Sequence, residues 1–339
     1  MIQRAWITTN RNCNLKCEWC YAQNSVSRSL DLNVAKKIIS NLHELGIKNY
    51  ALIGGEPTIY RHFFELISYL QSFKASVFVT SNGIKFSDKD FAKSAVNAGL
   101  SGVDISIKGL TEDEYIKNTR SKGLDCAVVA YRNLTELGIP SSVSYVFTVF
   151  DKKRIELMLD MLQEKELNRV YFQFVKPVVG EENSQLMSCA DMGKCVDELF
   201  FSIERKKEEG FYFDYKVEVS FPICLIKNDV YEKLKNEKRI TTCCHIQKGT
   251  GIIFDTDMTV IPCNHFANYP FIDDKPILEI KDIIELWKSK EVNSFRQVAQ
   301  RYPSIKCSSC YKWSECGGGC FTRWLSADPH NIIPGLLSE

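Results

Sequence analysis

Residues 13–20 read Cys-Asn-Leu-Lys-Cys-Glu-Trp-Cys and directly follow an apolar run at residues 5–9 that is typical of a β-strand. Cys13, Cys17 and Cys20 have the spacing Cys-x3-Cys-x2-Cys. Three thiolates so close in one loop can ligate three irons of a [4Fe–4S] cube, which leaves the fourth iron without a protein ligand. An open coordination position distinguishes a catalytic metal site from a structural one. A zinc site is the alternative, but zinc wants four ligands and no nearby His or Cys supplies the fourth.

Apolar runs alternate with amphipathic helical segments around this loop. The pattern predicts strands at residues 5–9, 50–53, 76–80, 102–107, 142–149 and 169–175. It predicts helices at residues 32–45, 63–73, 88–98, 125–137 and 154–165. Such alternation indicates an α/β fold with a parallel sheet, either an open barrel or a doubly wound sheet. In both, the functional loops lie at the C-terminal ends of the strands.

Composition narrows the class of protein. The chain has 339 residues, enough for one large and one smaller domain. Its 43 basic and 42 acidic residues give a net charge of +1, which indicates neither a nucleic-acid partner nor a basic membrane patch. The N-terminus lacks a signal peptide, and no apolar run reaches the ~18 residues of a membrane span, so we expect a cytoplasmic location. Fourteen cysteines in a reducing compartment indicate metal binding or thiol chemistry.

The cysteine loop, with Trp19 before its last cysteine, resembles the signature of the radical S-adenosylmethionine (radical SAM) superfamily. The resemblance implies a partial (β/α)6 TIM-like barrel and a catalytic [4Fe–4S] cluster at Cys13, Cys17 and Cys20. It implies that the open iron chelates S-adenosylmethionine and that one electron splits the cofactor into methionine and a 5′-deoxyadenosyl radical. The radical would then abstract a hydrogen atom from the substrate. A low-potential donor, flavodoxin or ferredoxin, would supply the electron.

The same resemblance marks residues that would hold S-adenosylmethionine in the loops after the second, third and fourth strands and beyond. The Gly-Gly-Glu-Pro stretch at residues 54–57 resembles the motif that meets the methionine amino group, where Glu56 would accept from the ammonium. The Ser-Asn-Gly stretch at residues 81–83 resembles the segment that faces the carboxylate and ribose. The full expected set is Gly54, Gly55, Glu56, Ser81, Asn82, Ser106 and Arg120.

A second cysteine group lies near the C-terminus. Its spacing is Cys-x2-Cys-x5-Cys-x3-Cys, and two further cysteines bracket a predicted hairpin at residues 251–254 and 259–262. By itself this group fits a zinc ribbon equally well. Beside the first loop it resembles the SPASM extension, which holds auxiliary [4Fe–4S] clusters. The resemblance implies a radical SAM core at residues 1–210 and a smaller SPASM-like domain at residues 211–339, in which residues 280–300 are helical.

The resemblance also suggests how the ligands divide. One auxiliary cluster would take Cys244 or Cys243, together with Cys263 and Cys320. A second would take Cys307, Cys310 and Cys316. The family's pattern has a glycine where Met258 stands and one more cysteine after the last one here. The fourth ligand of the second cluster is therefore open: Asp328, His330, or no protein ligand. Cys224, or the spare member of the Cys243/Cys244 pair, would complete the first.

Several reactions share this architecture. We expect modification of a ribosomally made peptide by crosslinking or epimerisation. The alternative is radical oxidation, decarboxylation or epimerisation of a small molecule such as a sugar or antibiotic intermediate. Formylglycine formation is a third reading, but Asn264 stands where that class has an aspartate base. A non-catalytic metal-binding scaffold would leave the open three-cysteine loop without a purpose. The sequence singles out no residue that handles the substrate.

Overall fold

The computed structural model describes residues 2–22, 25–179, 186–242, 244–245, 247–273, 275–299, 303–304, 307 and 309–326. The chain forms two compact units, each described here by itself. The first comprises Met1–Ser142 with His245–Arg296, and the second Val143–Cys244 with Gln297–Glu339. Within the described ranges, no helix has the length and apolar character needed to cross a membrane.

The first unit is built on a mainly parallel sheet with the strand order β10-β9-β1-β2-β3-β4. Among the strands that the structure describes in this unit, only β9 and β10 pair antiparallel. Trp6 on β1 packs against Ile53, Ile253 and Ile261 from three neighbouring strands, so apolar contacts support the pairing. The strands are β1 (Arg4–Asn10), β2 (Asn49–Gly54), β3 (Ser76–Ser81), β4 (Gly102–Ile107), β9 (Gly251–Phe254) and β10 (Val260–Ile261).

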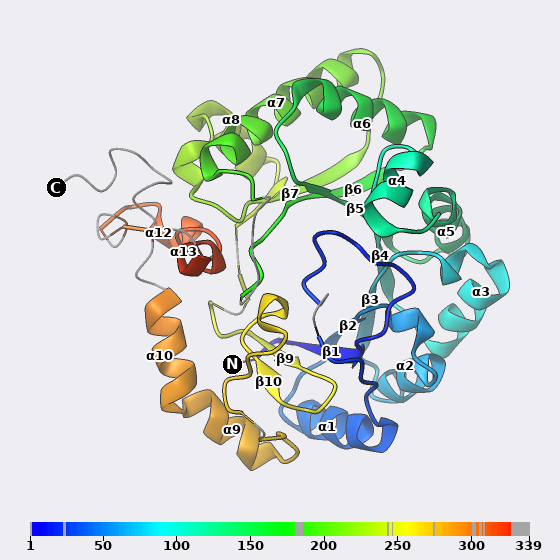
Figure 1. The fold of residues 1–339 in the computed structure, drawn as a ribbon, viewed down its shortest axis with the longest axis vertical. Coiled ribbons are helices and arrows are strands. Elements are labelled where there is room, and N and C mark those ends of the chain that lie inside the picture. Colours follow the sequence, from blue (N-terminus) through cyan, green and yellow to red (C-terminus); the bar gives the residue numbers. More distant parts are fainter. Residues whose placement is uncertain are drawn as a thin grey trace. The chain divides into compact units, whose positions relative to one another are not determined.

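Helices connect these strands, and Figure 1 shows α1, α2 and α3 along one side of them. Several ends follow local rules: Asp31 and Asp88 accept backbone N–H groups at the starts of α1 and α3, and Gly99 ends α3 with φ +105°. The helices are α1 (Leu32–Glu44), α2 (Phe63–Ser72), α3 (Lys89–Ala98), α4 (Glu112–Thr119), α5 (Leu124–Glu136), α9 (Ile280–Lys288) and the start of α10 (Lys290–Ala299), with 3₁₀ turns η1 (Pro57–Ile59), η2 (Lys85–Ser87) and η4 (Asn264–Phe266).

The second unit has four parallel strands in the order β5-β6-β7-β8. Phe147, Phe172, Phe174 and Phe221 are almost fully buried and stack or meet edge to face in its core. Its elements are β5 (Ser141–Phe147), β6 (Arg169–Phe174), β7 (Asp214–Glu218), β8 (Ile240–Thr241), α6 (Lys152–Glu164), α7 (Cys189–Glu208), η3 (Ile223–Leu225), α8 (Asn228–Asn236), α12 (Trp313–Cys316) and α13 (Thr322–Ser326).

The predicted α/β fold class is confirmed, since all six predicted strands are present and those of the six that pair within a unit run parallel. The prediction of one continuous helix at residues 280–300 is wrong in one respect. Ser289 adopts an extended backbone with ψ 161° and separates α9 from α10, and its hydroxyl accepts the N–H of Val292.

The compact units do not divide the chain at residue 210. Strand β9 pairs with β1 in parallel, with Arg4 opposite Gly251 and Ile7 opposite Phe254. Residues 245–296 are therefore part of the first unit rather than of a separate C-terminal body. The expected domains, a catalytic core at residues 1–210 and an auxiliary-cluster domain at residues 211–339, are defined by function and stay a prediction.

Met258 explains how the hairpin tolerates the missing glycine. Its φ of +63° lies in the left-handed region, which favours glycine because a side chain crowds the backbone there. Its N–H donates to the carbonyl of Asp255 at 2.9 Å, which closes the turn. The side chain is 1% exposed, so its burial offsets the backbone strain.

Candidate functional site

The first cysteine loop begins where β1 ends and is held by backbone hydrogen bonds. Lys16 and Glu18 donate their N–H groups to the carbonyls of Thr119 and Asn118 at 2.9 and 3.1 Å, at the end of α4. Within the loop, the N–H of Cys20 donates to the carbonyl of Cys17 at 3.3 Å. The loop therefore has a defined course.

Burial of the first-loop thiols opposes their ionisation, although two backbone N–H groups point at sulfur. The N–H groups of Leu15 and Ala22 point at the sulfurs of Cys13 and Cys20, each at 3.4 Å. Burial raises the pKa of Cys13 to about 11 and also raises the pKa of Cys17, whereas the nearby Lys108 ammonium opposes the shift at Cys17. Burial opposes free thiolates, so positive iron would be the partner that makes them favourable.

Two glycines let the turn after β2 lie directly against the cysteine loop. A Cβ on Gly54 would fall 2.3 Å from the carbonyl oxygen of Asn10, and one on Gly55 would fall 2.2 Å from that of Asn12. The N–H groups of Gly55 and Glu56 donate to these same two carbonyls, each at 2.8 Å. Only glycine permits so close an approach, so the Gly-Gly-Glu turn packs directly against the cysteine loop.

Glu56 joins this turn to the one after β3. Its Oε1 accepts from the N–H and hydroxyl of Thr58 and from the hydroxyl of Ser81, and its Oε2 accepts from the N–H of Asn82 at 2.7 Å. The carboxyl is 1% exposed, and burial raises its pKa while the four donors oppose the shift. A carboxylate has about four acceptor sites, so protein groups already use most of them.

The other expected ligand-binding residues lie around this core. The Asn82 amide donates to Oδ1 of Asn14 in the cysteine loop at 2.7 Å, which joins the third turn to the first. Ser106 is partly exposed near the end of β4. Arg120 ends α4 with φ +63°, and its exposed guanidinium lies 3.3 Å from Glu18. The structure brings Glu56, Ser81 and Asn82 together; contact with a cofactor stays a prediction for the whole set.

A buried ion pair that the sequence did not reveal holds the start of the cysteine loop. Arg11 donates through Nε and Nη2 to the two carboxylate oxygens of Asp255, at 3.0 and 2.5 Å. Both side chains are buried, and the residues are 244 positions apart. Arg11 directly follows β1, which is a signal of a functional position, but nothing in the sequence identifies Asp255 as its partner.

Chemistry and geometry together fit an iron–sulfur cluster at the first loop. Trp19 has a buried Nε1 donor with no acceptor among the described residues, one position before Cys20. As they stand in the described ranges, no three His, Cys, Asp or Glu side chains gather closely enough for a single metal ion. A cube holds its thiolates farther apart than one ion does, because each sulfur binds a different iron. Cys13, Cys17 and Cys20 would hold such a cluster.

The C-terminal cysteine segment contacts η3 within the second unit. The N–H of Ile223 donates to the sulfur of Cys316 at 3.5 Å, which places η3 beside α12. Burial raises the pKa of Cys224, and the charges of Cys316, Cys307 and Cys310 raise it further. Cys224, expected in the first auxiliary set, thus directly follows a residue that contacts Cys316 of the second.

Cys320 has a different neighbourhood in the same unit. It lies near Arg323, a guanidinium that is 3% exposed and whose pKa is lowered by burial. Arg323 donates to the carbonyls of Ser220 and Val175. No carboxylate pairs with it in the part of the chain that the structure describes. Bonds to backbone carbonyls thus hold this buried cation in place.

The remaining expected ligands cannot be grouped from the structure. Cys263 belongs to the first compact unit, whereas Cys244 and Cys320 belong to the second. Cys243, Asp328 and His330 lie outside the described residues. The proposed ligand set of the first auxiliary cluster therefore stays a prediction.

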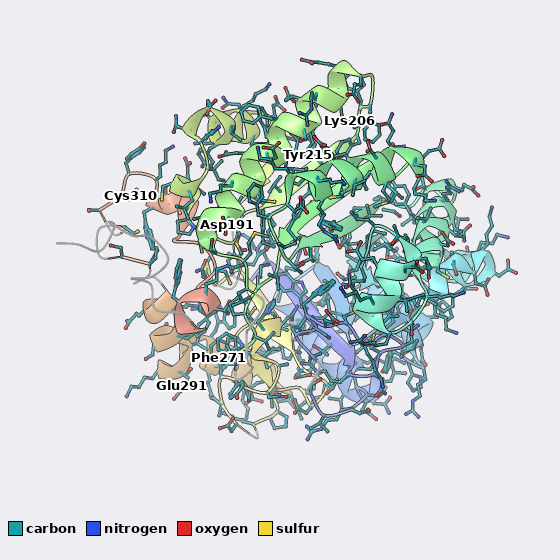
Figure 2. The ribbon with its side chains drawn as sticks, turned by 45° about the horizontal axis from the view of Figure 1, so that its top comes forward. Asp191, Lys206, Tyr215, Phe271, Glu291 and Cys310 are labelled. Carbon is teal, nitrogen blue, oxygen red and sulfur yellow. The ribbon has the colours of Figure 1, made fainter. Side chains whose placement is uncertain are left out.

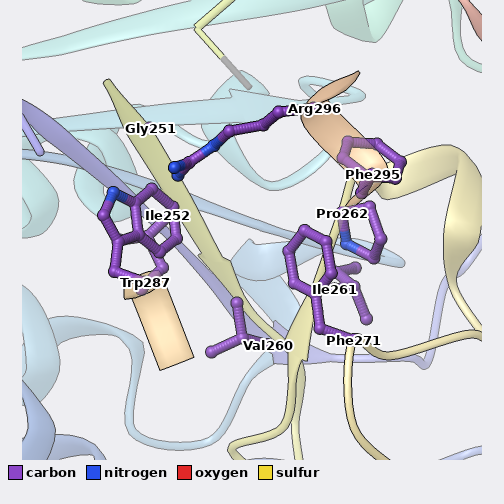
Figure 3. Close-up of a pocket in the computed structure, with 9 residues that line it drawn as sticks. All are labelled: Gly251, Ile252, Val260, Ile261, Pro262, Phe271, Trp287, Phe295 and Arg296. Carbon is purple, nitrogen blue, oxygen red and sulfur yellow. The ribbon is translucent and has the colours of Figure 1, made fainter. Parts of the chain in front are cut away.

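A small hollow beside the β9–β10 hairpin is mainly apolar (Figure 3). Arg296 reaches across it and stacks over the Trp287 ring, 4.6 Å from the centroid. Phe271, Phe295 and Ile261 line another part of its wall. Because none of the expected site residues lines it, we assign it to packing of α9 and α10 on the hairpin.

Comparison with known proteins agrees with this site. Residues 7–163 match the model of the Radical SAM superfamily. The Fe-coproporphyrin III synthase of Methanosarcina barkeri is 27% identical over 213 residues, which cover 61% of this chain and 52% of that protein. The chain spans about half the length of the curated relatives that it matches first.

Two solved structures share the fold over essentially the whole chain. Streptococcus suis SuiB bound to precursor peptide SuiA has a TM-score of 0.75 at 17% identity, covering 100% of this chain and 76% of SuiB. Native anSMEcpe with bound AdoMet has a TM-score of 0.73 at 18% identity, covering 99% of this chain and 93% of that one.

Arg11→Ala should destabilise the protein because it leaves the buried Asp255 carboxylate unpaired. We expect a loss of about 3–5 kcal/mol in the free energy of unfolding, measured by denaturant titration under reducing conditions. Arg28→Ala is the matched control, since Arg28 pairs with Asp257 of the same hairpin at 2.9 Å but is exposed. That loss should be about 0–1 kcal/mol. Equal losses in the two variants would contradict a special role for the buried pair.

Glu56→Gln should loosen the turn after β3. An amide nitrogen in place of one carboxylate oxygen would face an N–H or hydroxyl donor, which costs about 1–3 kcal/mol for the buried group left unsatisfied. Hydrogen exchange of a peptide covering residues 81–84 should accelerate. Glu65→Gln, on the exposed face of α2, serves as the control and should leave this exchange unchanged. Unaltered exchange in Glu56→Gln would show that the carboxylate does not hold the turn.

Proposed function

We propose that this chain, in which residues 7–163 form a radical SAM domain, cleaves S-adenosylmethionine reductively and uses the resulting radical on a substrate. The proposal rests on hydrogen bonds that join the three loops following β1, β2 and β3. The cysteine loop, the Gly-Gly-Glu turn and the Ser-Asn-Gly turn meet through the Gly55, Glu56 and Asn82 hydrogen bonds. Open metal ligation and cofactor binding would thus share one rigid framework.

In this proposal each part of the framework has its own task. Cys13, Cys17 and Cys20 hold the cluster, and the backbone N–H groups at Leu15 and Ala22 stabilise charge on sulfur. When bound, the cluster and S-adenosylmethionine supply a 5′-deoxyadenosyl radical. Gly54 and Gly55 let the cofactor approach the backbone. Glu56 orders the turn that presents Ser81 and Asn82, while Ser106 and Arg120 contact the cofactor from β4 and α4.

A low-potential flavodoxin or ferredoxin would deliver the electron. Such a donor is needed because iron–sulfur potentials extend to roughly −700 mV. The expected C-terminal clusters would lie in the SPASM-like part of the chain, ligated by cysteines from residue 224 onward. Their support is the contact between η3 and the C-terminal cysteine segment in the second unit.

For the substrate we propose a ribosomally made peptide, which the enzyme would crosslink or epimerise. Support comes from the shared fold with SuiB, which was solved with its precursor peptide. The competing proposal is a small molecule, favoured by the relative named Fe-coproporphyrin III synthase. A formylglycine-forming reaction is disfavoured because Asn264, at the start of η4, has an amide in place of a carboxylate base.

Anaerobically reconstituted enzyme, reduced with dithionite and given S-adenosylmethionine, should form 5′-deoxyadenosine, measured by liquid chromatography and mass spectrometry. Cys17→Ala should reduce its formation to background and remove about four irons. Cys126→Ala is the control because Cys126 lies on α5 and is not one of the three loop cysteines, and it should keep both. Absence of 5′-deoxyadenosine from fully reconstituted enzyme, even with substrate present, would contradict the proposed function.

The substrate class can be tested with peptides encoded by short reading frames adjacent to the gene. A true substrate should increase 5′-deoxyadenosine formation and lose two hydrogens on crosslinking, or gain solvent deuterium in D₂O on epimerisation. Tandem mass spectrometry would locate the change, and a scrambled peptide is the control. Turnover only with a small-molecule candidate would replace the peptide proposal with its alternative.

A further inference from the structure

The loop before and within η3 runs alongside the C-terminal cysteine segment in the second unit. The N–H of Cys320 donates to the carbonyl of Ser220 at 3.0 Å, and the N–H of Ile223 donates to the sulfur of Cys316 at 3.5 Å. A Cβ on Gly319 would fall 2.6 Å from the Cα of Phe221. Cys224 therefore directly follows a residue whose N–H contacts the sulfur of Cys316, although Cys224 and Cys316 are 92 positions apart in the sequence.

The other two cysteines of this group are brought to the same place by a compact fold of residues 307–317. The N–H of Cys310 donates to the carbonyl of Cys307 at 3.1 Å, and that of Trp313 donates to the carbonyl of Cys310 at 2.9 Å. The N–H of Gly317 then closes α12 on Trp313 at 2.8 Å. Successive turns thus place the three thiols on one short segment.

This segment is fixed to α8 by polar contacts. Glu315 accepts from Tyr231 and Lys235, each at 2.6 Å, and Lys312 lies 3.1 Å from Glu232. On the other side, a Cβ on Gly193 of α7 would fall 2.1 Å from the carbonyl of Leu225, so η3 packs tightly on that helix. Helices α7 and α8 of the second unit therefore hold η3 and the cysteine segment in place, in addition to the contact between the two.

The four thiols differ in exposure. Cys224 and Cys310 are exposed, Cys310 being labelled in Figure 2, whereas Cys307 and Cys316 are partly buried. Thiolate is the soft ligand by which proteins hold iron–sulfur clusters.

We propose that Cys224, Cys307, Cys310 and Cys316 together ligate one [4Fe–4S] cluster, with Cys224 on η3 as its fourth protein ligand. The juxtaposition of η3 with residues 307–316 carries this inference. It deepens the proposed function and rests on it for the identity of the metal centre. It replaces two earlier expectations: that Cys224 completes the other auxiliary set, and that Asp328 is the substitute for the missing last cysteine.

Complete ligation has a chemical consequence. With four thiolates, each iron of the cube has a protein ligand, so no iron is open to substrate. The cluster would then exchange electrons or stabilise the unit, and it would not bind substrate directly. Four thiolates also make the cluster less prone to lose an iron than the three-cysteine cluster at the N-terminal loop.

The test uses the full chain carrying Cys13→Ala, Cys17→Ala and Cys20→Ala, so that only C-terminal clusters remain. Cys224→Ala is added to this parent, and each protein is reconstituted anaerobically. Iron, sulfide and zinc are measured, and electron paramagnetic resonance spectra are recorded before and after ferricyanide treatment. Relative to the parent, Cys224→Ala should either lose about four irons or form a [3Fe–4S] signal on oxidation.

Two further variants keep the result interpretable. Cys224→Ser should retain a cluster with a shifted spectrum, because an oxygen ligand is harder than sulfur. Cys126→Ala in the same parent removes a cysteine elsewhere and should match the parent. Since Cys224 is exposed, alanine there leaves no buried cavity, and circular dichroism should confirm an unchanged fold.

The inference fails if Cys224→Ala keeps the parent's iron, spectrum and resistance to ferricyanide, or if the four cysteines hold zinc. Asp328→Ala changing the spectrum when Cys224→Ala does not would restore the carboxylate assignment. The outcome is independent of the proposed function. If enzyme with an intact N-terminal loop makes 5′-deoxyadenosine but Cys224→Ala does not change the C-terminal cluster, only the inference is wrong. If Cys224→Ala changes the cluster but the intact enzyme makes no 5′-deoxyadenosine, only the proposed function is wrong.

Discussion

Strand β1 is hydrogen-bonded on both sides, to β2 and to β9, and this double pairing determines where the candidate site can form. It fixes the point at which the chain leaves the sheet. The buried pair between Arg11 and Asp255 then sets the direction of the first residues beyond it. Because the Gly-Gly-Glu turn bonds to Asn10 and Asn12, the cysteine loop is positioned from one strand on each side.

Main-chain contacts, more than side-chain packing, hold the cysteines of both units. At the first loop, the carbonyls of Thr119 and Asn118 accept N–H groups from the loop, and at the C-terminal segment the carbonyl of Ser220 accepts from Cys320. Such contacts specify where the backbone of each cysteine segment runs. This arrangement suits a metal centre, since its ligands must be held in place and yet remain available for coordination.

Periodicity predicted β1 through β6 and the helices α1, α2, α3, α5 and α6 because each segment's pattern is local, but it missed α4. The break at Ser289 was missed, since both flanking segments are amphipathic and only the serine's capping bond to Val292 marks it. The motifs at residues 13–20 and 54–57 were readable because chemistry requires those residue types. Long-range packing determines the pairing of β9 with β1, the Arg11–Asp255 contact and the contact of η3 with the C-terminal cysteine segment. Such packing cannot be predicted from one sequence.

The position of β9 has a consequence for synthesis of the chain. The edge of β1 that β9 covers belongs to residues 4–7, yet its partner begins at residue 251. At a translation rate of about 5–20 residues per second, that edge waits roughly 10–50 s for its partner to be made. An uncovered strand edge is a template for pairing with other chains. Nascent chains would thus need protection by chaperones, or slow compaction, until the hairpin emerges from the ribosome.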